Sequence, residues 1–237
     1  MSAVIRVDSL NKTFARKQAL FNLKLEIQAG EMVALIGASG SGKSTLLRHV
    51  AGLARCDRDN GGSIDVLGRR LQASGRLSGE VRRLRADIGY IFQQFNLLPF
   101  LSVRENVELP CHFSALRRQR ARERHGSPAQ AASHLLGQLG LGGELHERRA
   151  DSLSIGQQQR VAAARALIGQ PELVIADEPT SALDADSREA FLQLLFAECR
   201  EAGASLLFVS HDQSLAGLFD RSLSLSDLNR AARPAGL

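Results

Sequence analysis

The chain of 237 residues contains no tryptophan, only three cysteines and no apolar run of membrane-spanning length. Its apolar runs, such as residues 173–176 and 206–209, have the length of a β-strand. A transmembrane helix would need roughly 18 apolar residues in a row. Residues 1–12 alternate between polar and apolar side chains, so they lack the apolar core of a secretory signal. We therefore expect a cytoplasmic protein without membrane spans.

The cysteines and the lysines are both sparse. Cys56, Cys111 and Cys199 lie far apart and form no CxxC pair, so neither a disulfide framework nor a zinc site is supported. We expect isolated reduced thiols. Every lysine lies at or before Lys43, and arginine supplies all later basic residues except histidine. The net charge of +5 permits an anionic partner without naming one.

Hydrophobic patterning predicts an α/β fold in one large domain with a smaller lobe. The expected strands are residues 4–7, 23–27, 31–36, 63–67, 88–92, 173–176 and 206–209, and the expected helices are 43–53 and 187–202. Apolar strands separated by helices indicate a buried, largely parallel sheet. Residues 94–165 read as mostly helical, with breaks at Pro99, Pro110 and Pro128, so we interpret them as an inserted lobe.

A glycine-rich segment between a strand and a helix fits the phosphate-loop pattern. Its residues are Gly37, Ala38, Ser39, Gly40, Ser41, Gly42, Lys43, Ser44 and Thr45. The glycines let successive backbone N–H groups turn inward around the phosphates of a nucleotide. Lys43 supplies positive charge there, and the Ser44 hydroxyl is placed to coordinate Mg²⁺. The segment predicts nucleotide binding but does not specify a reaction.

Two adjacent carboxylates, Asp177 and Glu178, follow the apolar strand 173–176. Neighbouring side chains on a strand point to different sides, so the two groups can take different roles. Asp177 would hold the metal, directly or through water, and Glu178 would orient and deprotonate an attacking water. Acidic pairs after strands also serve as helix caps or solvated turns. The phosphate loop favours the catalytic interpretation.

Ser154 and Gln157, three positions apart before an alanine-rich run, form a capping-box pattern that predicts a helix N-terminus. Such an end presents unpaired N–H groups and the positive pole of the helix dipole, which suit an anion. Taken alone, this segment favours an ordinary capped helix over an anion site.

In their order and spacing these motifs resemble the nucleotide-binding subunits of ABC transporters over nearly the whole chain. The resemblance implies a P-loop ATPase core with an N-terminal antiparallel β portion, formed by residues 1–93 and 166–237, and a helical lobe at 94–165. It implies ATP and Mg²⁺ as cofactors. It also implies two copies packed head to tail, with a separate integral membrane permease on which the chain sits at the cytoplasmic face, and no nucleic-acid partner.

The resemblance assigns roles to further residues. Gln93 matches the glutamine that contacts Mg²⁺ and faces the membrane partner, and His211 matches the switch histidine at the γ-phosphate. Phe14 lies where the family stacks an aromatic ring on adenine. Asp184, at the end of the segment 181–184, matches the loop that crosses the dimer interface. The plain alternatives are a solvated loop amide for Gln93, a structural histidine for His211, and a surface or core aromatic for Phe14.

The resemblance completes three sets of expected site residues. The catalytic residues are Glu178, His211 and Gln93, and the metal ligands are Ser44, Gln93 and Asp177. The nucleotide contacts are Phe14, the phosphate loop from Gly37 to Thr45, and, across the dimer, Ser154, Gly156, Gln157 and Asp184.

Ile155 departs from the family pattern, because the family has a glycine at this position of the Ser154–Gln157 segment. As the first helical residue after a serine cap it has negative φ, so a side chain is sterically allowed. We expect the helix end to survive. Looser approach of the opposite subunit's phosphate, and a weakened ATPase, are the consequences to test.

The transporter subtype is the least determined feature. Residues 89–99 and 103–110 look most like the ATPases of lipoprotein release and macrolide efflux, which we prefer. Residues 83–89 with the following phenylalanines also look like phosphonate importer ATPases. A non-transport ABC ATPase of DNA repair or translation stays as a third alternative, although the chain lacks the coiled-coil insertion or second nucleotide site of those families.

Residues 117–124 form the densest basic run. A solvated helix face is the reading that we expect, and contact with anionic lipid is the functional alternative. Nucleic acid is less expected, since no aromatic residues alternate with the arginines.

Overall fold

The computed structural model describes residues 3–59, 62–181 and 183–232. Its internal contacts divide the chain into two compact units, which are described separately below. The first unit is Met1–Arg85 with Ser205–Leu237, and the second is Ala86–Ala204. Within the described ranges, no helix is both long enough and apolar enough to span a membrane.

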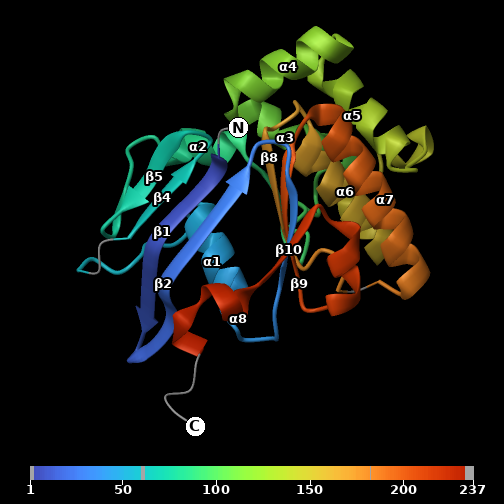
Figure 1. Ribbon diagram of the computed structural model, residues 1–237. Helices are drawn as coiled ribbons and strands as arrows, with labels where there is room; N and C mark the ends of the chain where they lie inside the picture. Colours follow the sequence, from blue (N-terminus) through green and yellow to red (C-terminus); the bar gives the residue numbers. More distant parts are fainter. Residues whose placement is uncertain (1–2, 60–61, 182, 233–237) are drawn as a thin grey trace. The chain divides into compact units, whose positions relative to one another are not determined.

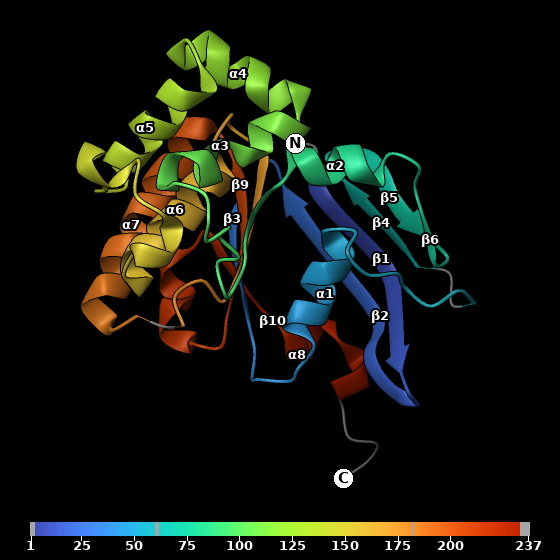
Figure 2. The same ribbon diagram turned by 180° about the vertical axis from the view of Figure 1, so that it is seen from behind.

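The first unit contains an antiparallel sheet with the strand order β2-β1-β4-β5-β6. Its strands are β1 (Ala3–Phe14), β2 (Lys17–Gln28), β4 (Ser63–Val66), β5 (Arg69–Ala73) and β6 (Arg76–Leu77). Ala15 and Arg16 join β1 to β2 with φ values of 41° and 76°, the left-handed geometry that suits the twist of a two-residue hairpin. The helix α1 (Lys43–Val50) packs against β2 and β4 (Figure 2).

Three parallel strands complete the first unit, with β3 in the middle. They are β3 (Met32–Ile36), β9 (Ser205–Ser210) and β10 (Arg221–Ser224). All residues of β3 and β9 are buried, as expected for strands inside a parallel sheet. The predicted strands 31–36 and 206–209 are confirmed to within one residue. The polar strand β10 was not predicted, because its Arg-Ser-Leu-Ser sequence carries almost no apolar signal.

The C-terminal part of the first unit, α8 (Leu225–Leu228) and the following residues, packs on β2 (Figure 1). Asn229 is 1% exposed. Its Oδ1 accepts a hydrogen bond from Phe21 N at 2.9 Å, and its Nδ2 donates to the Ala19 carbonyl at 2.8 Å. That carbonyl would lie 3.2 Å from a side-chain carbon on Gly42. Asn229 thus fixes the stretch of β2 that lies directly behind the phosphate loop.

In the part of the chain that the structure describes, the second unit combines two parallel strands with a group of α-helices (Figure 1). The strands are β7 (Gly89–Ile91) and β8 (Leu173–Asp177), and the helices are α3 (Val103–Phe113), α4 (Ala115–His125), α5 (Pro128–Gln138), α6 (Ile155–Leu167) and α7 (Ala185–Ala202); α2 (Val81–Asp87) leads into the unit. The central helix is α6, which contacts α3, α5 and α7. Its alanines at 162–164 are fully buried, and their small side chains let the neighbouring helices approach closely.

Two of the predicted element boundaries need correction. Pro110 does not break the helical region but lies in the last turn of α3, which continues to Phe113. Pro128 does open a helix, as the first residue of α5, where its missing N–H costs nothing. The helix predicted over 187–202 starts two residues earlier and ends at Gly203, whose φ of 63° closes it.

The three cysteines are free and buried, as the sequence predicts. Burial raises the pKa of Cys199 to about 12, and burial also raises the pKa of Cys111. A thiol with a raised pKa carries little thiolate at neutral pH, so these side chains act as small apolar residues of the core.

Candidate functional site

The phosphate loop connects β3 to α1 and is shaped by backbone geometry. Gly40 and Gly42 have φ values of 75° and 107°, which a residue with a side chain rarely adopts. Gly42 is the N-cap of α1 and provides no side-chain cap to the helix. A helix N-terminus without a side-chain cap suits an anion, because it combines backbone N–H groups with the positive pole of the helix dipole.

Lys43 is held inside this loop. Its side chain is 4% exposed, and its Nζ donates to the carbonyls of Gly37 at 2.6 Å and Ala38 at 2.9 Å. Ser41 Oγ is also buried and makes no hydrogen bond with the described residues. A side-chain carbon on Gly37 would lie 3.0 Å from that oxygen. The loop thus combines a buried ammonium, an unpaired hydroxyl and room created by glycine, which fits a phosphate group.

His211 and Phe14 belong to the same unit as the phosphate loop. β3 and β9 run in parallel with Ile36 opposite Ser210, and Gly37 N donates to the Ser210 carbonyl at 3.3 Å. His211 therefore leaves its strand beside the start of the loop, with its side chain exposed. Phe14 ends β1, is 51% exposed, and has the Lys12 ammonium 5.1 Å from its ring centroid. A half-exposed ring at a hairpin end suits stacking on a base.

Asp177, Glu178 and Gln93 are brought together by the parallel strands of the second unit. Ile91 lies opposite Ala176, so the residues that follow β7 and β8 emerge at one edge. Gln93 is exposed, whereas both carboxylates are half-buried. Glu178 has a φ of 46°, an uncommon conformation for a residue with a side chain. Carboxylate and amide oxygens are ligands that Mg²⁺ prefers, so this donor set fits the metal.

The N-terminus of α6 has the geometry that the sequence predicts. Ser154 Oγ accepts from Gln157 N at 3.3 Å, and Gln157 Oε1 accepts from Ser154 N at 3.0 Å. Ile155 is the first residue of the helix and is 55% exposed. The helix end therefore tolerates Ile155. A side-chain carbon on Gly156 would meet nothing within 4 Å, so the surface beside it is open.

Asp184 is the N-cap of α7. Its carboxylate accepts from Ser187 N at 2.8 Å and from Ser187 Oγ at 3.1 Å. These hydrogen bonds lower the pKa of Asp184. Ala182, in the same predicted interface loop, lies outside the described residues. The sequence interpretation missed the capping role, although Asp184 followed by Ser187 is a recognisable cap signal.

The basic run 117–124 lies in α4, and the prediction of a solvated face is wrong for its first member. Arg117 is 2% exposed and burial lowers its pKa to about 10. Arg120 donates to the Gln170 carbonyl at 2.6 Å and pairs with Glu172, and Arg124 pairs with Glu201. These arginines bind other elements of their own unit. A buried arginine is not visible in the sequence because its partners lie far along the chain.

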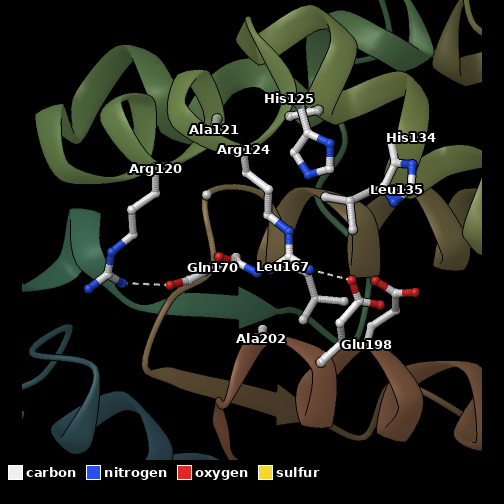
Figure 3. A pocket seen from close by; sticks show the side chains of 13 residues that line it. Arg120, Ala121, Arg124, His125, His134, Leu135, Leu167, Gln170, Glu198 and Ala202 are labelled. Carbon is white, nitrogen blue, oxygen red and sulfur yellow. Dashed lines mark hydrogen bonds and ion pairs between the residues drawn. The ribbon is translucent and has the colours of Figure 1, made fainter.

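A small cavity of about 30 Å³ lies between α4, α5 and α7. Figure 3 shows Arg120 and Arg124 extending from α4, with His125 and His134 side by side at the other end. The two imidazole rings are 4.7 Å apart, and burial, then the neighbouring His134, lowers the pKa of His125. Burial raises the pKa of Glu198, which also lines the cavity. The volume admits water but no nucleotide, so this is not the ATP site.

Gln159 is a site residue that the sequence interpretation missed. It lies in α6, is 1% exposed, and donates through Nε2 to the Pro179 carbonyl at 2.8 Å. Pro179 directly follows Glu178, so this bond fixes the backbone that carries the proposed base. No local pattern signals the contact, because 20 residues separate its partners.

Comparison with known proteins gives consistent results. Residues 20–181 match the ABC transporter family. The phosphonates import ATP-binding protein PhnC 1 of Pseudomonas aeruginosa is 64% identical over 218 residues, covering 91% of this chain and 78% of the relative. The phosphonates import ATP-binding protein PhnC of Escherichia coli is 44% identical over 217 residues, covering 91% and 82%.

Two solved structures are similar along most of the chain. One is a dimeric ATP-binding cassette in a post-hydrolysis state with bound ADP and Pi, with 34% identity, a TM-score of 0.77 and 93% coverage of both chains. The other is cbiO1 from Clostridium perfringens, part of the ABC transporter complex cbiONQ. It has 27% identity and a TM-score of 0.77, and the alignment covers 94% of this chain and 85% of cbiO1.

Proposed function

Because the chain belongs to the ABC transporter family and is one of its ATPases, we propose that it powers a phosphonate importer. The observation that carries the substrate class is the 64% identity to a phosphonates import ATP-binding protein over 91% of the chain. These relatives favour the importer over the lipoprotein-release and macrolide-efflux subtype that we preferred from the sequence. The chain supplies ATP hydrolysis, and a separate membrane permease supplies the path.

In the proposed nucleotide site the phosphate loop binds ATP. The N–H groups of Gly37 to Thr45 surround the β- and γ-phosphates, and Lys43 exchanges its loop carbonyls for phosphate oxygens. Phe14 stacks on the adenine ring. Support comes from the buried Lys43 ammonium, the unpaired Ser41 hydroxyl and the exposed Phe14 ring.

In this proposal, one group of residues acts on the attacking water and the γ-phosphate, and a second group holds Mg²⁺. Glu178 accepts a proton from the attacking water, while His211 donates a hydrogen bond to the γ-phosphate. Asp177, Gln93 and Ser44 would supply the oxygen ligands for Mg²⁺. When bound, the metal neutralises charge on the phosphates. The shared edge of β7 and β8 supports the grouping of Gln93 with the two carboxylates.

The complete site in this proposal needs two copies of the chain. Each ATP lies between the phosphate loop of one copy and Ser154, Gly156 and Gln157 of the other, with Asp184 close to the interface. The dimeric cassette with ADP and Pi supports this arrangement, and the assignment of cbiO1 to the complex cbiONQ supports a membrane partner. Residues 94–165 would form the lobe that faces the permease at the cytoplasmic side of the membrane. No nucleic-acid partner is part of the proposal.

The test is uptake of a labelled alkylphosphonate. A Pseudomonas aeruginosa strain without its own phosphonates import ATP-binding proteins receives the chain or its Glu178→Gln variant. The proposal expects uptake with the parent chain and none with Glu178→Gln. If the purified chain hydrolyses ATP but does not restore uptake, the assignment as an ATPase stands and the assignment to phosphonate import is wrong.

A further inference from the structure

Arg165 connects the helix α6 to the segment that follows Gln93. Its Nη1 donates to the Asn96 carbonyl at 2.8 Å, and its Nη2 donates to the Phe95 carbonyl. Burial lowers the pKa of Arg165 to about 10, so the guanidinium remains charged at neutral pH. A planar fork that grips two adjacent carbonyls fixes their orientation more tightly than a single ammonium can.

The segment held by Arg165 has an unfavourable backbone conformation. Phe95 and Asn96 are consecutive residues with φ values of 59° and 49°. Two left-handed residues with side chains in a row persist only where the surroundings hold them. Arg165 provides such a hold, and the buried Phe95 side chain, 7% exposed, provides another.

Gln93 lies inside the turn that this segment completes. Phe95 N donates to the Phe92 carbonyl at 2.9 Å, which closes the turn around Gln93. On the entry side, the Phe92 ring packs on Tyr90 of β7 with centroids 4.3 Å apart. On the exit side, Arg165 binds the carbonyls of Phe95 and Asn96. Loss of the guanidinium would remove these bonds after the turn, whereas the packing of Phe92 before the turn would remain.

The part of α6 that carries Arg165 is itself fixed to β7. Arg117 donates to the carbonyls of Ile168 at 2.7 Å, Ala166 at 2.6 Å and Ile88 at 3.3 Å. A side-chain carbon on Gly89 would lie 2.5 Å from the Ala166 carbonyl, so helix and strand are in close contact there. Arg165 therefore reaches the Gln93 turn from a base that is rigid with respect to the strand leading into it.

We propose that Arg165 is a positioning residue for Gln93. It holds the turn so that the Gln93 amide meets the metal-bound nucleotide in one orientation. This inference rests on the proposed role of Gln93 as a Mg²⁺ ligand. Residues that orient a metal ligand typically change metal affinity or activity by about 10–100-fold when they are replaced.

The experiment measures ATP turnover against Mg²⁺ concentration for Arg165→Met, Arg165→Lys and Gln93→Ala. Arg165→Met should raise the Mg²⁺ concentration for half-maximal activity and lower kcat, each about tenfold, with KM for ATP nearly unchanged at saturating Mg²⁺. Arg165→Lys should fall between parent and Arg165→Met. The matched control is Arg120→Met, which also removes an arginine–carbonyl bond of the second unit, and it should keep the parental Mg²⁺ dependence.

A double variant separates positioning from general damage. In the Gln93→Ala background, Arg165→Met should cause no further change in Mg²⁺ dependence, whereas multiplied losses would overturn the inference. Hydrogen exchange should rise at residues 92–97 in Arg165→Met and stay parental in α7; unchanged exchange at the turn would also overturn it. Should Arg165→Met fail to fold, Arg165→Lys takes its place, and parental Mg²⁺ dependence in that variant decides against the inference.

Failure of the two proposals can be told apart. Gln93→Ala with parental Mg²⁺ dependence would remove the proposed role of Gln93 and, with it, the role of Arg165. A changed Mg²⁺ dependence in Gln93→Ala beside a parental one in Arg165→Met would remove only the role of Arg165.

Discussion

The phosphate loop of the first unit and the arginines Arg117 and Arg165 of the second unit bind backbone carbonyls in opposite ways. In the first unit, Lys43 binds carbonyls only 5 and 6 residues before it, so the loop binds its own cation. In the second unit, Arg117 and Arg165 bind carbonyls that lie 29 to 70 residues away. In the first arrangement the contacts of the cation are local to the proposed binding loop, and in the second the geometry of the segments beside the proposed catalytic residues depends on distant elements. Substitutions should therefore affect binding in the first unit and stability or turnover in the second.

The largest expected effect is on turnover in the second unit. Glu178→Gln removes the base and keeps the shape, so ATP hydrolysis should fall by about 10² to 10⁴ while ATP binding is retained. Steady-state ATPase assays with gel filtration test this, and a dimer should accumulate with ATP. Asp177→Asn is the comparison, since it should weaken Mg-ATP binding as well. Near-parental turnover in Glu178→Gln would exclude Glu178 as the base.

Replacement of Arg117 should have the largest effect on stability. Arg117→Met leaves several buried carbonyls without a donor, so the free energy of unfolding should fall by about 2–4 kcal/mol. Urea unfolding measures the loss. Arg122→Met, at an exposed position of the same helix, should change little. Equal stability of the two variants would contradict the structural role of Arg117.

Replacement of Lys43 should separate ligand binding from stability. Lys43→Ala removes the charge that meets the phosphates, so ATP affinity should fall about 10- to 100-fold, the worth of one charged hydrogen bond. Calorimetric titration gives the affinity, and thermal unfolding should show a smaller change than in Arg117→Met. The assignment of the phosphate loop fails if parent and variant bind ATP equally well.

Ile155 tests the segment that would face the other subunit. Ile155→Gly should raise basal ATPase activity and tighten the ATP-trapped dimer in the Glu178→Gln background. Glycine in the first helical turn costs about 0.5 kcal/mol of stability or somewhat less, so the gain in rate should come with a slightly lower melting temperature. A rate that stays equal or falls would show that Ile155 does not restrain the site.

The smallest expected effect is a pH dependence of stability, caused by side chains that line the cavity in the second unit. Burial lowers the pKa of His125, which faces His134 of α5, Arg124 of α4, and Glu198 and Glu201 of α7. Because its pKa is lower in the folded chain, His125 takes up a proton more readily in the unfolded chain. Its contribution to stability is therefore present above about pH 6.5 and is lost as the pH falls through the folded pKa.

The pKa of Glu198 is raised, which has the opposite sign: its contribution is present at low pH and is lost as pH rises through the folded pKa. His125→Gln should flatten the drop in stability below about pH 6.5 in urea unfolding. An equal drop in parent and variant would assign it to other groups.

Features that depend on local order could be predicted from the sequence. The phosphate loop, the Ser154 cap and the strand ending in Asp177 each lie within a few residues, and each was found. The family relationship and the ATPase activity followed from their combination. The lengths of β1 and β2 were underestimated, because bulges carry this hairpin beyond its alternating apolar part and the Ala15–Arg16 turn lacks glycine or asparagine.

Features that depend on long-range contacts could not be predicted. Arg117 read as part of a solvated run because its carbonyl partners lie in other elements. Gln159 and Arg165 received no role from the sequence, although each binds a backbone carbonyl of a loop in the proposed active site. The left-handed backbone of Glu178 has no local signal, since glutamate is not a residue that favours it. Side-chain contacts between distant segments were the missing information in each case.

The contact between Asn229 and β2 would link nucleotide binding at the proposed phosphate loop to docking of the C-terminal segment. Asn229 holds the Ala19 carbonyl, and that carbonyl lies behind Gly42 of the phosphate loop. Two equilibria that share a structural element affect each other by equal free energies. A ligand that tightens the loop should therefore disfavour the release of residues 225–232 from β2, and Asn229→Ala, which weakens this docking, should weaken ATP binding by at most the same coupling free energy. Protection of residues 225–232 from proteolysis should then increase with ATP concentration, although the proposed ATP contacts lie elsewhere in the sequence.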